Sequence, residues 1–105
     1  MSQWIEACAA DDIAAEDVLR FDHAGKTYAI YRSPDDKYYA TDGLCTHGVA
    51  RLCEGFVLDD IIECPMHNGR FHIPTGRVDG PPACEALRTY AVRVEGKALQ
   101  IRLEP

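Results

Sequence analysis

The sequence predicts an all-β fold, on three observations. Short runs of β-branched, aromatic and apolar residues follow one another along most of the 105-residue chain. Turn-forming residues separate these runs at short intervals, as they do in hairpins. Six of the eight glycines and four of the six prolines fall between residues 42 and 82. We therefore expect one domain spanning residues 1–105, in which a β-framework flanks an inserted, turn-rich lobe.

The part of the framework before the lobe is predicted to hold four strands joined by turns. His23-Ala24-Gly25 is typical of a hairpin turn between two strands. The expected elements are a strand at residues 3–7, an acidic loop or single helical turn at 11–17, strands at 18–22 and 26–31, a turn at 33–36 and a strand at 37–41.

The lobe has few strand signals of its own. Glycine and proline at this density suit a backbone that turns often and approaches another group closely. Residues 61–63 are apolar enough to predict one short strand. After the lobe, strands at residues 88–94 and 99–103 flank Glu95-Gly96-Lys97 and are expected to pair as a hairpin.

Two short segments carry the chemistry. Cys45-Thr46-His47 and Cys64-Pro65-Met66-His67 each join one cysteine to one histidine, with sixteen residues between them. A zinc site usually groups its ligands as C-x₂₋₄-C and H-x₃₋₅-H. Because each segment mixes the two ligand types, the spacing favours two neighbouring irons, and zinc remains the alternative. A catalytic cysteine–histidine pair would leave the second segment unexplained.

These motifs and their neighbours, in segments 39–48 and 62–71, resemble those of bacterial Rieske-type ferredoxins. The resemblance is strongest to the ferredoxins of aromatic-ring-hydroxylating dioxygenase systems, and it covers nearly the whole chain. Further matching segments lie at residues 75–76, 81–84 and 89–92. The resemblance implies three antiparallel sheets and one Rieske [2Fe–2S] cluster, held at an exposed tip of a lobe at about residues 42–82.

The resemblance also implies which residues form the cluster site. Cys45 and Cys64 would bind the buried iron, and His47 and His67 the outer iron. The residues expected around the cluster are Gly48, Val49, Met66, Gly69, Pro81 and Pro82. Backbone N–H groups of the glycines beside the ligands, which are Gly43, Gly48 and Gly69, are expected to point at the cluster sulfurs.

Near the cluster ligands, the sequence differs from those of respiratory-chain Rieske proteins. Those proteins join their cluster loops by a disulfide, whereas this chain has Ala50 and Met66 at the corresponding positions. Their serine and tyrosine, which donate hydrogen bonds to cluster sulfurs, correspond here to Gly69 and Phe71. Fewer donors stabilise the reduced state less, so we predict a reduction potential near the bottom of the Rieske range, about −150 mV.

Composition argues against several classes of partner and compartment. The net charge of −6, without a run of lysine or arginine, disfavours nucleic acid and anionic membranes. No apolar run reaches the roughly 18 residues that span a bilayer, and the first residues lack the features of a signal peptide. Five cysteines, an odd number, argue against a disulfide framework. We expect a cytoplasmic protein, with Cys8, Cys53 and Cys84 as ordinary thiols.

The function implied by the resemblance is one-electron transfer rather than catalysis. A flavoprotein reductase that uses NAD(P)H would supply electrons, and a terminal Rieske oxygenase would receive them through transient docking. No histidine follows Val78, so this part of the chain lacks the ligands of a mononuclear oxygenase iron. We expect a monomer. The alternative is a Rieske-like small subunit of a larger reductase, such as assimilatory nitrite reductase.

Overall fold

The computed structural model describes residues 3–46, 50–66, 69–80 and 85–103. Within these ranges the chain forms strands, turns and two short 3₁₀ turns, η1 (Ala10–Asp12) and η2 (Leu52–Glu54). The strands are β1 (Gln3–Ala9), β2 (Asp17–His23), β3 (Lys26–Arg32), β4 (Tyr38–Asp42), β5 (Phe56–Leu58), β6 (Ile61–Glu63), β7 (Arg70–His72), β8 (Val78–Gly80), β9 (Thr89–Tyr90), β10 (Val92–Glu95) and β11 (Ala98–Leu103).

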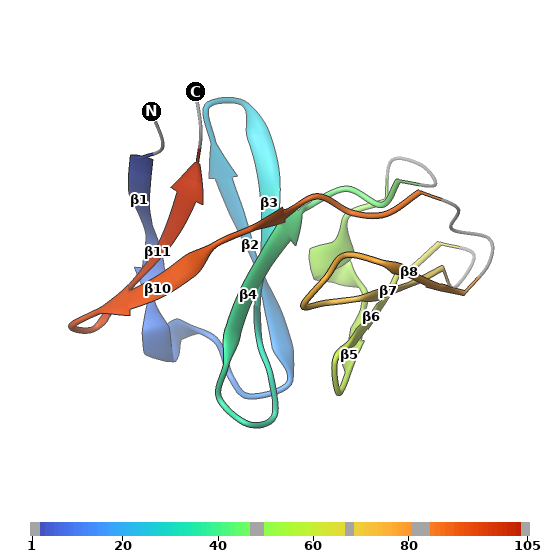
Figure 1. Cartoon of the computed structure of the whole chain (residues 1–105), viewed down its shortest axis with the longest axis horizontal. Coiled ribbons are helices and arrows are strands. Elements are labelled where there is room, and N and C mark those ends of the chain that lie inside the picture. The colour runs from blue at the N-terminus through green and yellow to red at the C-terminus, as the bar shows by residue number, and fades with distance from the viewer. Residues whose placement is uncertain (1–2, 47–49, 67–68, 81–84, 104–105) are drawn as a thin grey trace.

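The strands form three antiparallel sheets, ordered β1–β11–β10, β2–β3–β4–β9 and β5–β6–β7–β8 (Figure 1). The first two sheets are called the framework below. The third sheet and the loops that join it to β4 and β9 are called the lobe. The predicted all-β fold with three sheets is confirmed. Among the described residues, no helix is long and apolar enough to cross a membrane.

Strand β3 connects two hydrophobic cores because it is buried on both faces. Alternate residues of a strand point to opposite sides. Tyr28 and Ile30 face the core shared with the first sheet, and Ala29 and Tyr31 face the core shared with the lobe. Their four consecutive side chains are all buried, which explains the uninterrupted apolar run in this strand.

The two cores differ in what they enclose. The framework core contains Ile13, Tyr28, Ile30, Ala40, Leu99 and Ile101. The lobe core contains Ala29, Tyr31, Cys45, Ala50, Leu52, Ile62, Cys64, Phe71, Ile73 and Leu87. Two of the predicted metal ligands are therefore part of the hydrophobic core that joins the lobe to β3.

The predicted hairpin between β2 and β3 is confirmed, and the backbone conformation of two residues explains its turn. Ala24 and Gly25 both have positive φ, at 51° and 80°. A two-residue turn of this kind matches the right-handed twist of the flanking strands. The β2–β3 register is regular, from Asp17 opposite Arg32 to His23 opposite Lys26.

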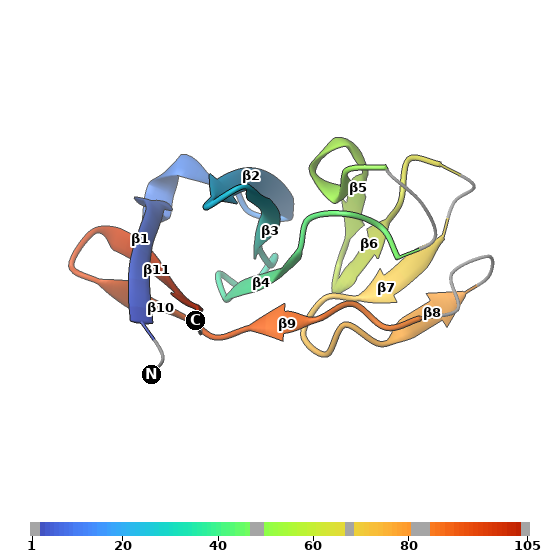
Figure 2. The ribbon, with the colours of Figure 1, turned by 90° about the horizontal axis from the view of Figure 1, so that it is seen from above.

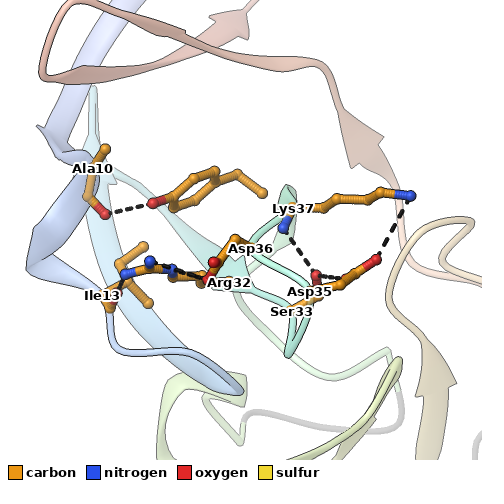
Figure 3. Close-up of polar contacts among 8 residues, drawn as sticks. Ala10, Ile13, Arg32, Ser33, Asp35, Asp36 and Lys37 are labelled. Carbon is orange, nitrogen blue, oxygen red and sulfur yellow. Dashed lines mark hydrogen bonds and ion pairs between the residues drawn. The ribbon is translucent and has the colours of Figure 1, made fainter.

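Side-chain contacts hold the connection between β1 and β2 against the β3–β4 hairpin (Figure 3). Arg32 Nη1 donates to the carbonyl of Ile13 at 2.8 Å, and Tyr38 Oη donates to the carbonyl of Ala10 at 2.8 Å. Arg32 also forms an ion pair with Asp36 at 3.0 Å. These donors satisfy carbonyls that no strand partner reaches.

Two expectations about strands are wrong. The lobe was expected to hold one strand, yet it has four, each three residues long. Runs this short, between glycine and proline, show no alternation that a sequence pattern can detect. The expected strand at residues 88–94 is interrupted at Ala91, because β9 pairs with β4 whereas β10 pairs with β11. The chain thus passes from the second sheet to the first at that residue (Figure 2).

Candidate metal centre

The first loop of the lobe begins where β4 ends, and Gly43 holds it against β3. The Gly43 N–H donates to the Thr27 carbonyl at 2.9 Å, and its own carbonyl accepts from the Leu52 N–H at 2.8 Å. A Cβ on Gly43 would lie 2.6 Å from Thr27 Cγ2 and 2.8 Å from the Thr27 carbonyl carbon. Glycine is therefore needed for this close approach. The expectation that the Gly43 N–H points at a cluster is wrong, since Thr27 accepts it.

Backbone pairing closes the first loop. Leu44 and Arg51 form an isolated antiparallel bridge, and the Cys45 N–H donates to the Ala50 carbonyl at 2.9 Å. Cys45 thus lies at the base of the loop, with its side chain only 3% exposed. His47, Gly48 and Val49 fall outside the described residues.

The second loop, between β6 and β7, is closed in a similar way. The Cys64 N–H donates to the Gly69 carbonyl at 2.7 Å. Within the loop, the backbone N–H of Met66 lowers the pKa of the Cys64 thiol. The Met66 side chain is 47% exposed, so the loop combines a buried cysteine with an outward-facing apolar residue. His67 falls outside the described residues, as do Pro81 and Pro82.

The two loops bring Cys45 and Cys64 together. The two thiols are neighbours in one buried cluster, where the Cys45 thiol acts on the pKa of Cys64 and Cys64 is only 1% exposed. Burial raises the pKa of Cys64 to about 11, the Met66 N–H opposes the rise, and the neighbouring Cys45 thiol adds to it. Without a metal the Cys64 thiol is therefore protonated at neutral pH, and a metal that binds it as a thiolate displaces that proton.

The described residues hold half of the predicted ligand set. Among them no group of three or more histidines, cysteines or acidic residues lies close enough to hold a metal, and both predicted histidine ligands fall outside this part of the chain. His72, which was not expected to be a ligand, has its Nδ1 2.8 Å from Thr75 Oγ1. Two adjacent, buried thiols in an apolar shell suit an iron with thiolate ligands.

Two contacts near the site were not expected from the sequence. Thr46 Oγ1, between the cysteine and histidine of the first motif, donates to the Glu85 carbonyl at 2.7 Å. The Leu87 N–H donates to the Gly76 carbonyl at 2.8 Å. Both contacts bind the segment that follows residues 81–84 to the lobe. The partners are far apart in sequence, 39 residues for Thr46 and Glu85, so no local pattern could reveal them.

The comparisons with known proteins agree with this geometry. The model of the Rieske [2Fe–2S] domain family matches residues 3–91. The chain belongs to the Rieske [2Fe–2S] domain family. Its cofactor is one Rieske [2Fe–2S] cluster, which confirms the predicted cofactor and leaves zinc without support. The paired thiols of Cys45 and Cys64 fit the iron that takes two thiolates.

Individual relatives narrow the class further. The chain is 44% identical over 101 residues, 96% of each protein, to the ferredoxin component of the naphthalene 1,2-dioxygenase system of Pseudomonas aeruginosa. The Sphingomonas yanoikuyae B1 ferredoxin matches with a TM-score of 0.91 at 30% identity, over 97% of this chain and all of the other. These relatives are ferredoxins, which confirms the prediction of an electron-transfer component rather than a catalyst.

Two further structures bear on the choice of partner system. A chain in the complex of reduced oxygenase and oxidized ferredoxin of carbazole 1,9a-dioxygenase is 36% identical, with a TM-score of 0.88, over 93% of this chain and 91% of the other. A putative NADH-dependent nitrite reductase small subunit from Mycobacterium tuberculosis has a TM-score of 0.87 at 20% identity, over 100% and 98% of the two chains. At that identity the second match shows the fold alone.

Proposed function

We propose that this protein is a cytoplasmic one-electron carrier. It accepts electrons from an NAD(P)H-dependent flavoprotein reductase and delivers them to a terminal Rieske oxygenase. The observation that carries the proposal is the pair of buried thiols beneath two loops, in a chain that matches ferredoxin components over nearly its whole length. We further propose that residues 1–105 form one domain and act as a monomer.

The proposed ligands divide between the two irons. Cys45 and Cys64 hold the inner iron, and His47 and His67 hold the outer iron. The residues proposed to surround the cluster are Gly48, Val49, Met66, Gly69, Pro81 and Pro82. The bound cluster supplies reversible exchange of a single electron. The chain contributes an apolar shell that excludes water and an N–H donor, from Met66, that stabilises charge on a ligand sulfur.

The surface beside the cysteines suits brief contacts with other proteins. Leu44 directly precedes Cys45 and is 46% exposed, and Met66 lies in the loop of Cys64 and is 47% exposed. Apolar side chains at an exposed end provide the dry centre of a small interface. The net charge of −6 steers the carrier toward basic surfaces of its partners. Transfer rates should therefore fall as ionic strength rises.

The reduction potential stays a prediction of about −150 mV, near the lower limit of Rieske centres. Gly69 has no side chain, and Phe71 is fully buried in the core that contains both cysteines. Neither offers a hydroxyl to stabilise the reduced state. Protein-film voltammetry measures the midpoint directly, and a value above zero would contradict this account.

A two-part experiment tests the proposed function. Electron paramagnetic resonance of the dithionite-reduced protein should show the rhombic signal of mixed thiolate and imidazole ligation. Stopped-flow mixing of the reduced protein with a purified Rieske oxygenase should then show single-electron oxidation that slows as salt is added. A protein that purifies only with a large catalytic subunit would favour the nitrite reductase alternative. A silent spectrum after iron loading would exclude the cluster.

A further inference from the structure

A basic hollow lies beside β9, away from the cysteines. Its volume is about 260 Å³, and it is lined by Arg88, Thr89, Tyr90, Ala91 and Arg102. Strand β9 belongs to the second sheet and Arg102 lies in β11 of the first, so the hollow is located where the chain passes between these two sheets of the framework (Figure 2). Two of its five lining residues are arginines.

Neither arginine has an acidic partner among the described residues. In the part of the chain that the structure describes, six of the eleven lysines and arginines have a carboxylate oxygen within 4.0 Å, but Arg88 and Arg102 do not. This is notable in a chain with 17 acidic residues. Among the described residues neither guanidinium group donates a hydrogen bond, and arginine binds carboxylates in a two-pronged geometry that lysine lacks.

The backbone holds the two arginines in place before any ligand arrives. The Arg88 carbonyl accepts from the Asp42 N–H at 2.9 Å, and the Arg102 N–H donates to the Ala91 carbonyl at 2.9 Å. The Arg88 guanidinium also lies 5.2 Å from the centre of the Tyr90 ring. The backbone at both positions and the Arg88 side chain are thus held before a ligand binds, which lowers the entropic cost of binding.

A second hollow extends the basic surface toward the metal centre. It has a volume of about 250 Å³ and is lined by Gly25, Lys26, Thr27, Asp42 and Leu44. Lys26 Nζ joins the two hollows, because it lies 3.0 Å from Tyr90 Oη and 3.0 Å from Asp42 Oδ1. We call Lys26, Arg88 and Arg102 the basic strip. Among the described residues Asp42 is the one carboxylate that lines either hollow, and Leu44 directly precedes Cys45.

We propose that the basic strip binds an acidic segment of a redox partner. Carboxylates of that segment reach Arg88 and Arg102 while the partner faces the cluster end of the molecule beyond Leu44. The remainder of this acidic protein repels acidic surfaces, so an acidic segment gains energy only when it is aligned with the strip. Two adjoining hollows suit a row of carboxylates better than a single small anion. Only the identity of the partner rests on the proposed function.

Binding is tested first without any redox partner. A fluorescein-labelled hexaglutamate peptide is titrated with oxidised holoprotein, and fluorescence anisotropy reports the affinity. R88E and R102E should weaken binding by about fivefold or more each. The matched control is R77E, which makes the same charge change at an exposed arginine in the β7–β8 turn that also has no acidic partner among the described residues.

Three results would overturn the proposal at this stage. The first is that R77E weakens hexaglutamate binding as much as R88E and R102E do. The second is that a hexaglutamine peptide binds as tightly as hexaglutamate. The third is that inorganic phosphate at matched charge concentration displaces hexaglutamate, which would indicate a small-anion pocket. The visible spectrum of the cluster shows whether each variant is folded. If a charge reversal disrupts the fold, R88Q and R102Q replace it and should still weaken binding more than R77Q.

Electron transfer is tested second. The second-order rate constants with the reductase and with the oxygenase should fall by about fivefold or more in R88E and R102E for at least one partner, relative to R77E. The reduction potential should stay unchanged. Rates equal to the control with both partners would overturn the assignment to a redox partner. If the wild-type protein transfers no electron to either, the proposed function fails, while the peptide titration still decides whether the strip binds carboxylates.

Discussion

The framework and the lobe are both antiparallel β-structure, but they are stabilised differently. Strands β1, β2 and β3 have seven residues each, and their ladders run almost without interruption. Every strand of the lobe has three residues. Ladders this short leave much of the stability to loop contacts and to the core. The framework is thus suited to fold by burial alone, whereas the lobe needs further support.

The source of that support is visible in the lobe core. Cys45 and Cys64 lie in it beside Leu52, Ile62 and Phe71. A metal bound to the two thiols would link two loops that are otherwise closed, among the described residues, by a few backbone hydrogen bonds. Because binding free energy at a site formed only by folding adds to folding free energy, the cluster should stabilise the lobe much more than the framework.

Loss of a ligand gives the largest expected contrast between the two parts. Cys64→Ala should abolish the visible absorption of the cluster and remove hydrogen-exchange protection from β5–β8, while β1–β3 stay protected. Hydrogen exchange followed by mass spectrometry measures both regions in one sample. Cys8→Ala, at a half-buried thiol in β1, is the control and should keep the cluster. Equal loss of protection in both parts would show that they fold as one unit.

Two fully buried isoleucines provide a matched pair of core truncations. Ile30 lies in the framework core and Ile62 in the lobe core, each 0% exposed. Each change to alanine should cost about 3–4 kcal/mol of unfolding free energy in its own region. Ile62→Ala should also speed the release of iron to a chelator, whereas Ile30→Ala should leave that rate unchanged. Equal rates in the two variants would contradict an independent framework.

Substitutions at two glycines measure the cost of backbone strain separately from the cost of a steric clash. Gly25 in the framework and Gly76 in the lobe have φ values of +80° and +74°. A Cβ on Gly25 would meet nothing within 4 Å, but one on Gly76 would lie 2.1 Å from the Leu87 carbonyl oxygen. We expect Gly25→Ala to cost about 1 kcal/mol and Gly76→Ala about 3 kcal/mol. Urea denaturation measures both, and a similar cost for the two would mean that the Leu87 segment shifts freely.

The smallest predicted effect is at the contact between β4 and β9. Tyr90 Oη donates to Asp42 Oδ1 at 2.5 Å and accepts from Lys26. Burial and the hydrogen bond to Asp42 raise the pKa of Tyr90 above its usual value, although Lys26 opposes the rise. Tyr90→Phe should therefore cost about 1 kcal/mol near neutral pH.

This cost should also depend on pH in a defined direction. Since the pKa of Tyr90 is higher in the folded than in the unfolded protein, the neutral phenol contributes its full stability below about pH 10. That contribution is lost as the pH rises through the raised value. The stability difference between the wild type and Tyr90→Phe should thus narrow above about pH 10 in urea titrations. If the stability difference between the two proteins widens at high pH, the folded protein stabilises the ionised rather than the neutral phenol of Tyr90, which would contradict this prediction.

Local patterns predicted the framework well. The apolar run in β3 and the turn at Ala24 and Gly25 depend on residues close in sequence, and so do the bounds of β6, the one lobe strand that was predicted. The lobe was harder, because its strands are too short for a pattern and are defined by their neighbours. The interruption at Ala91 likewise results from two different pairing partners, which a local pattern does not contain.

The candidate site, too, was predicted from the sequence only in part. The spacing of two cysteines and two histidines in mixed pairs favoured two irons over zinc, because zinc sites usually group their ligands as C-x₂₋₄-C and H-x₃₋₅-H. The use of the Gly43 N–H was mispredicted, since Thr27 reaches it from another strand. The Thr46–Glu85 contact and the meeting of Arg88 with Arg102 were not predicted at all.

The sequence by itself determined the chemistry available to this protein: its metal-binding donors, its acidic charge and the apolar, β-branched runs between turns that produce β-structure. Only the tertiary structure decided which of these groups meet. Cys45 and Cys64 share a core because two loops pack on β3, and Arg88 and Arg102 line one hollow because the chain changes sheets at Ala91. Such contacts depend on how sheets pack across long sequence separations, which local residue preferences do not specify.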